Sequence, residues 1–195
     1  MATSPLEQLA QAGGRDFPQL LAARETTRAG LVERRSKLES LSHDEGASIV
    51  LMGSWGRSEV TTGSDDDFMI LVLGKKRDED NPSIDEIKTV LTRAPGDQGI
   101  FAKPVFSKKL VERIGLEKDK NSNTSRRMLF LLESVPATGN DTYRSVRDQL
   151  MARYLDESIK DYRPPRFLLN DVIRYWRTMC VDFAGKEHQD PKKWG

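Results

Sequence analysis

The apolar positions of the chain fall into two patterns, short continuous runs and longer helical repeats. Residues 48–52 (Ser-Ile-Val-Leu-Met) and 68–73 (Phe-Met-Ile-Leu-Val-Leu) are short runs bounded by glycine and polar segments. Runs of this length predict buried strands. Earlier in the chain, leucines recur at roughly helical spacing from residue 18 to 41 among many charges, which predicts an amphipathic helix.

Helix-end signals and one further apolar run complete the predicted elements. Ser4-Pro5 is typical of a helix start, and Ser83 is the expected cap of another helix that extends to about residue 91. Residues 100–107 predict a third strand, which Pro104 restricts to a sheet edge or a bulge because proline lacks a backbone N–H. Beyond residue 107 the pattern predicts helices at 110–114, 125–133, 143–154 and 167–183.

Together these elements predict an α/β (α+β) protein with a small mixed β-sheet core, flanked by helices and followed by an all-helical part. The expected division is N-terminal helices at 1–42, the core at 43–107 and the helical part at 108–195. The last residues, 191–195, follow a long helix whose far side has no obvious partner. Two interpretations are open, a frayed tail or a helical part that continues beyond this sequence.

Composition and charge exclude several classes of protein. No stretch approaches about eighteen consecutive apolar residues, and residues 1–15 have no basic-then-apolar leader, so neither a membrane span nor export is expected. Cys180 is the only cysteine, which excludes a disulfide framework, and we expect it to be buried in a helix. With a formal net charge of +1, any polyanion must be met by a local basic patch. We expect a cytoplasmic protein.

Asp65 and Asp67 carry the most specific chemical signal in the chain. They flank Asp66 at the start of the predicted strand 68–73. Because side chains alternate along a strand, both project from one face, about 7 Å apart at the backbone, and Asp66 points to the other face. Carboxylates at this spacing suit Mg²⁺ or Mn²⁺, which keeps water and phosphate oxygens as further ligands. The pair predicts a metal site at the mouth of the sheet.

A predicted phosphate-binding turn precedes this pair. Gly53 and Ser54 directly follow the first predicted strand, with ten residues between Ser54 and Asp65. Glycine permits a tight turn, and the serine hydroxyl with nearby backbone N–H groups can bind terminal phosphates. Arg57 adds a fork of donors to the same anion, and we assign Ser64 to the same set. Such a turn beside two carboxylates is the minimum for metal-assisted phosphoryl or nucleotidyl transfer.

The Gly-Ser turn at residue 53 and the aspartates at 65–67 resemble the GS…DxD signature of polymerase-β-like nucleotidyltransferases. This resemblance covers roughly residues 49–72. The chain as a whole is similar to uncharacterised bacterial nucleotidyltransferases in which this domain precedes a helical domain, with matching stretches at 123–134 and 165–178. The resemblance implies that the two aspartates bind two Mg²⁺ ions. It also implies that an acceptor hydroxyl attacks the α-phosphate of a nucleoside triphosphate and releases pyrophosphate.

The sequence departs from this family pattern at a third carboxylate, which the resemblance places on a later strand. Residues 99–106 contain no carboxylate, and Lys103 stands about where one is expected. Asp97 lies just upstream and is a candidate for the third catalytic acid. The alternative is a catalytically altered nucleotide-binding or regulatory module that acts through a partner protein. The acceptor stays open among a protein hydroxyl, a small molecule and an RNA end, as do the base preference and the oligomeric state.

Four polar residues of the helical part are further candidates for nucleotide or acceptor binding. Arg126 opens an apolar helix, where a cation opposes the helix dipole, so it binds either a phosphate or carboxylate of a ligand or a neighbouring helix. Asn170, Asp171 and Arg174 lie on a helix that is apolar on nearly all sides. They are therefore either buried and paired or face a cleft. The aromatic residues Trp55, Tyr175 and Trp176 are expected in the core.

Two other phosphate or metal motifs are excluded. An EF-hand loop that starts at Asp65 fails because Met69 and Ile70 occupy the positions of an oxygen ligand and the required glycine. The sequence has no Gly-Lys-Ser/Thr loop, which excludes a P-loop enzyme.

Overall fold

The computed structural model of the chain describes residues 5–41, 46–74, 84–91, 93, 101, 103–155 and 164–189. Its centre is a mixed four-stranded sheet in the order β3-β2-β1-β4. β1 (Ala47–Met52) pairs antiparallel with β2 (Phe68–Val72) and with β4 (Ser134–Pro136), and β2 pairs parallel with β3 (Pro104–Phe106). The predicted fold class is confirmed.

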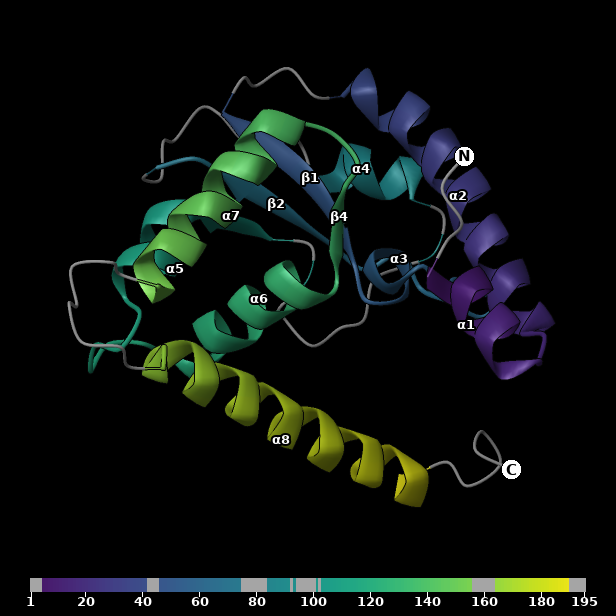
Figure 1. Ribbon diagram of the computed structural model, residues 1–195. Helices are drawn as coiled ribbons and strands as arrows, with labels where there is room; N and C mark the ends of the chain where they lie inside the picture. The colour runs from purple at the N-terminus through teal and green to yellow at the C-terminus, as the bar shows by residue number, and fades with distance from the viewer. Residues whose placement is uncertain are drawn as a thin grey trace.

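Helices lie on both sides of this sheet (Figure 1). Their bounds are α1 (Pro5–Gly13), α2 (Pro18–Glu39), α3 (Ser54–Arg57), α4 (Ile84–Val90), α5 (Ser107–Glu112), α6 (Asn121–Leu132), α7 (Asn140–Tyr154) and α8 (Arg166–Gln189). The side chains of alternate strand residues enter two separate cores. Ile49 and Ile70 pack with α2 and α4, whereas Val50 and Met69 pack with α5, α6 and α7. The strand register therefore decides toward which core each residue at a strand end points.

The edge position of Pro104 was predicted correctly, whereas strand β4 was not predicted. Pro104 lies in the edge strand β3, as predicted, although the strand is shorter than residues 100–107. The sequence pattern did not predict β4, whose three residues include Pro136 and lie in the part expected to be helical. β4 forms because it pairs with the end of β1, where the backbone O of Glu133 accepts a hydrogen bond from the N–H of Gly53 at 2.9 Å. Ser83 lies outside the described residues.

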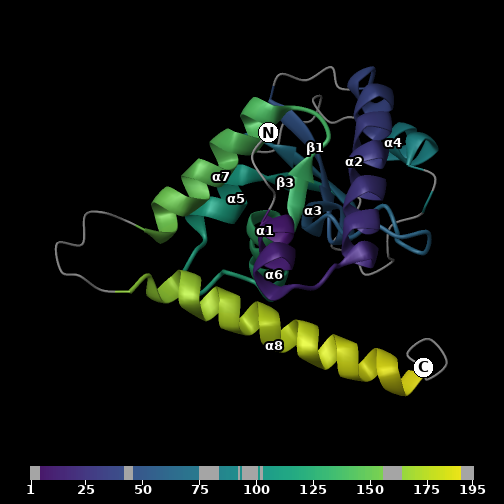
Figure 2. The same ribbon diagram turned by 45° about the vertical axis from the view of Figure 1, so that its right-hand side comes forward.

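Helix α8 runs along the outside of the molecule and packs chiefly on α6 (Figure 2). Asp171 and Tyr175 are its buried residues on that side. The prediction that Trp176 belongs to the core is wrong, because the residue is 55 % exposed. Cys180 is exposed as well, contrary to expectation. Among the helices that the structure describes, none is both long and apolar enough to cross a membrane.

Candidate functional site

The three aspartates before β2 differ in burial: Asp65 is exposed, Asp66 is buried and Asp67 is half-buried. Asp66 is fully buried and points toward α2, where its carboxylate accepts two hydrogen bonds of 3.1 Å from the guanidinium of Arg34. The indole N–H of Trp55 donates to the same carboxylate at 3.1 Å, and the Arg34 guanidinium lies 4.2 Å from the centre of the Trp55 ring. Asp66 is thus a structural anchor that fixes the aspartate segment against α2.

Asp67 lies beside the glycine turn. Its backbone O accepts a hydrogen bond from Met52 N at 2.9 Å, which continues the β1–β2 ladder by one residue. Gly53 has φ +63°, the left-handed conformation that glycine adopts without strain, and a Cβ placed there would lie 3.8 Å from Oδ2 of Asp67. Asp65, two residues earlier in the chain, is exposed. The structure therefore brings Gly53 and Asp67 together, and Asp65 precedes Asp67 by two residues in the chain.

The oxygen-only donor set fits a hard divalent cation, because Mg²⁺ takes one or two carboxylates and fills its remaining sites with water or phosphate. The predicted third acid, Asp97, lies outside the described residues. Within the described part of the chain, no three His, Cys, Asp or Glu side chains cluster around one point. Lys103 directly precedes β3, and its side chain is exposed.

Arg57 is held by two carboxylates at the end of α3. Its Nε donates to Oε2 of Glu59 at 2.7 Å, and its Nη1 donates to Oε2 of Glu133. The other oxygen of Glu133 accepts a hydrogen bond of 2.6 Å from the hydroxyl of Tyr175 on α8. Burial by itself lowers the pKa of Arg57, but the hydrogen bonds and charges of both carboxylates outweigh it and raise the pKa above the ordinary arginine value.

The glycine turn also packs directly on Glu133. A Cβ added at Gly56 would lie 2.1 Å from the carbonyl carbon of Glu133, so only glycine allows this approach. Glu133 was not among the predicted site residues. A signal for it exists in the sequence, since it is a carboxylate directly after an apolar helix and needs a partner if it is buried. Its partners, Arg57 and Tyr175, are too distant in the chain to be inferred from that signal.

The two serines differ in their surroundings. Ser54 begins α3 and is half-buried beside the glycine turn. The hydroxyl of Ser64 accepts a hydrogen bond from the N–H of Thr61 at 2.9 Å, and its carbonyl accepts one from Arg93 at 2.8 Å. Ser64 therefore shapes the turn that leads into the aspartates.

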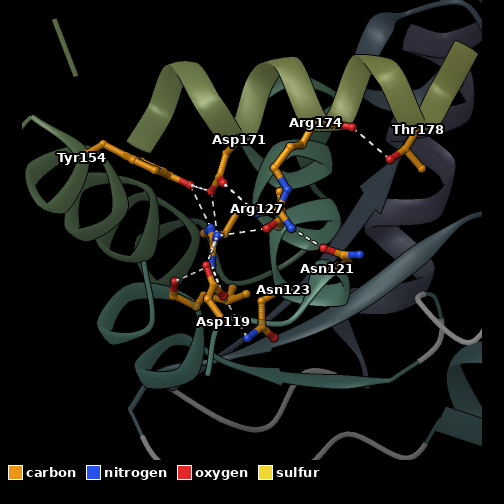
Figure 3. A network of polar contacts seen from close by, with 10 residues as sticks. Asp119, Asn121, Asn123, Arg127, Tyr154, Asp171, Arg174 and Thr178 are labelled. Carbon is orange, nitrogen blue, oxygen red and sulfur yellow. Dashed lines mark hydrogen bonds and ion pairs between the residues drawn. The ribbon is translucent and has the colours of Figure 1, made fainter. Parts of the chain in front are cut away.

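A buried polar network joins α8 to the rest of the molecule (Figure 3). Arg127, which is fully buried, donates two hydrogen bonds to Asp119, at 3.0 and 2.6 Å, and one to Asp171 at 2.6 Å. Tyr154 accepts from Arg127 at 2.8 Å and donates to Asp171 at 2.7 Å. Of the two alternatives for Asp171, buried and paired or facing a cleft, the structure shows the first. Although burial lowers the pKa of Arg127, its hydrogen bonds to the two aspartates raise it.

A cavity of about 450 Å³ lies between α6 and α8. Its lining residues are Asn121, Thr124, Ser125, Arg174, Tyr175, Arg177, Thr178, Val181 and Asp182. Arg174 donates a hydrogen bond to Asn121, and Arg177 makes no hydrogen bond or ion pair with the described residues. Asn170 is exposed on α8, and burial lowers the pKa of the half-buried Arg126. Arg174 is thus the predicted helical-part residue that faces a cavity.

Fold and site together define a mixed-sheet α/β protein in which a glycine turn and the carboxylate of Asp67 meet at one end of the central hairpin. Comparisons with protein-family models, with curated proteins and with solved structures found no match to this chain.

Proposed function

We propose that the protein is a metal-dependent nucleotidyltransferase, which moves a nucleoside monophosphate from a nucleoside triphosphate to a hydroxyl acceptor. The observation that carries this proposal is the meeting of the Gly53 turn and the Asp67 carboxylate at the end of the β1–β2 hairpin where β1 ends and β2 begins, with an exposed Asp65 two residues before Asp67 in the chain. A turn with close backbone access next to oxygen ligands is the arrangement that a metal–triphosphate complex requires.

Each residue has a definite role in this proposal. Asp65 and Asp67 are the residues that would hold Mg²⁺ or Mn²⁺, and the ion would supply positive charge to offset that of the triphosphate. Ser54 and Arg57 bind the terminal phosphates. The acceptor oxygen forms a bond to the α-phosphorus, the bond from that phosphorus to the bridging oxygen breaks, and pyrophosphate leaves, while the hydroxyl proton is lost to solvent.

The cavity between α6 and α8 supports a place for the organic part of a substrate. Its volume of about 450 Å³ lies within the range of small-molecule sites. Arg174 and Arg177 outnumber the single carboxylate, Asp182, in its lining, so the cavity has a net positive charge, which suits a substrate with a carboxylate or a phosphate. Asn170 and Arg126 remain predicted contacts, and the acceptor remains a protein hydroxyl, a small molecule or an RNA end. We assign the activity to the cytoplasm, in keeping with the single cysteine, Cys180.

Transfer of a labelled phosphate tests this function. The protein is incubated with Mg²⁺ and each triphosphate, labelled at either the α- or the γ-phosphorus, together with separated protein, small-molecule and RNA fractions of a cell extract. We expect the α-label on one acceptor fraction and the γ-label in pyrophosphate. Transfer of the α-label and release of labelled pyrophosphate are both expected to be lost in Asp67→Asn and retained in the exposed control Asp148→Asn. Transfer of the γ-label alone indicates a kinase, and binding without transfer by the folded protein indicates a nucleotide-binding module.

A further inference from the structure

Arg57, which the proposed function assigns to the triphosphate, already forms ion pairs with two carboxylates. Arg57 pairs with Glu59, whose side chain is about half exposed, and with Glu133, whose side chain is only 7 % exposed. Two acids therefore neutralise this guanidinium before any nucleotide arrives. Since Asp67 lies beside Gly53 in the same turn and Asp65 precedes it by two residues, a triphosphate without a cation meets a negatively charged site.

Glu133 is fixed to this position from three directions. Its backbone O accepts a hydrogen bond from Gly53 N at 2.9 Å, and its carbonyl group packs on Gly56. Its Oε1 accepts a hydrogen bond of 2.6 Å from Tyr175, which is itself buried. A buried carboxylate needs donors on its oxygens, because desolvation without them is costly. The carboxylate of Glu133 thus accepts one hydrogen bond from Arg57, in the predicted phosphate-binding turn, and one from Tyr175 on α8.

We propose that Glu133 is a positioning residue that occupies Arg57 in the nucleotide-free protein and yields it to the triphosphate. Tyr175 retains the Glu133 carboxylate once Arg57 has turned to the phosphates. This proposal rests on the proposed function, in which Arg57 binds the triphosphate. Helix α8 is then involved in nucleotide binding, because the Tyr175 hydroxyl on this helix keeps the Glu133 carboxylate hydrogen-bonded after Arg57 has left it.

Opposite effects of two conservative changes distinguish this exchange from a structural role. Glu133→Gln keeps the size of the side chain and one acceptor oxygen but removes the charge that competes for Arg57, so the affinity for triphosphate rises. Tyr175→Phe leaves the Glu133 carboxylate dependent on Arg57, so the exchange costs more and the affinity falls. If both residues merely supported the turn, both changes would weaken binding.

The experiment is a calorimetric titration with inorganic tripolyphosphate and Mg²⁺, a probe that requires no base preference. We expect Kd to fall about three- to tenfold in Glu133→Gln and to rise by a similar factor in Tyr175→Phe, which is the scale of one partly buried ion pair or charged hydrogen bond. Glu59→Gln, which removes the exposed carboxylate of the same arginine, is expected to lower Kd by about twofold or less. The exposed Asp148→Asn is the control. The double variant Glu133→Gln/Tyr175→Phe is expected to bind like Glu133→Gln alone.

Weaker binding in both single variants, or no change in Glu133→Gln, overturns the exchange. Thermal unfolding verifies that each variant is folded, and if Tyr175→Phe does not fold, the direction of change in Glu133→Gln decides the matter. Wild-type binding that Asp67→Asn abolishes, together with unchanged binding in Glu133→Gln, refutes the exchange and leaves the proposed function standing. Absence of binding by the folded wild type refutes both.

Discussion

Replacement of Arg127 by methionine is expected to reduce the free energy of unfolding by about 3–5 kcal/mol, the usual cost of removing one partner from a buried ion pair. Arg127 is fully buried and makes ion pairs of 2.6 Å with both Asp119 and Asp171. Methionine fills a similar volume but leaves two largely buried carboxylates facing each other without that cation. Tyr154 can still donate one hydrogen bond to Asp171, which limits the loss.

Urea unfolding followed by circular dichroism measures this loss. Arg147→Met is the matched control, because Arg147 forms an exposed pair with Asp148 and is expected to change stability by less than about 1 kcal/mol. The slope of free energy against urea is expected to stay the same, which separates a stability change from a change in the unfolded state. A loss in Arg127→Met no larger than that in Arg147→Met would refute the argument that this network stabilises α8 against the rest of the molecule.

Three further perturbations test other contacts. Burial and a carboxylate partner raise the pKa of Tyr154 and Tyr175 above the ordinary value of 10.0, so the folded state keeps phenol protons that the unfolded chain loses. Stability is therefore expected to fall above about pH 10 by up to about 1.4 kcal/mol per pH unit for each tyrosine, and Tyr154→Phe is expected to halve the slope of urea-derived stability against pH. Gly56→Ala is expected to cost at least about 2–3 kcal/mol in thermal unfolding because of its contact with the backbone of Glu133, whereas Gly63→Ala, with open space around it, stays within about 0.5 kcal/mol. Asp66→Ala is expected to cost about 2–3 kcal/mol in urea unfolding, because it leaves the guanidinium of Arg34 and the indole N–H of Trp55 without their carboxylate; an unchanged midpoint would contradict that.

Local sequence signals were sufficient for much of the fold. The apolar runs at 48–52 and 68–73 became β1 and β2, because helices cover both faces of the sheet and leave no polar face to interrupt the pattern. Strand geometry alone predicted that Asp66 points away from Asp65 and Asp67, and the burial of Asp66 agrees with that prediction.

Features that depend on distant contacts were not accessible in this way. β4 has three residues and forms only because the end of β1 lies beside it, so no local sequence pattern predicts it. Glu133 belongs to the candidate site through Arg57, 76 residues away, and through Tyr175, 42 residues away. The exposure of Trp176 likewise depends on which side of α8 meets α6, which an almost uniformly apolar helix does not specify.

The central claim is a metal–nucleotide site at the end of the β1–β2 hairpin where β1 ends and β2 begins. It is tested most directly by calorimetric titration of ATP, GTP, CTP and UTP with and without Mg²⁺. The proposed site predicts Mg²⁺-dependent binding of at least one triphosphate, lost in the double variant Asp65→Asn/Asp67→Asn and retained in Asp148→Asn. Binding that survives in the double variant, or no binding by the folded wild type, would contradict it.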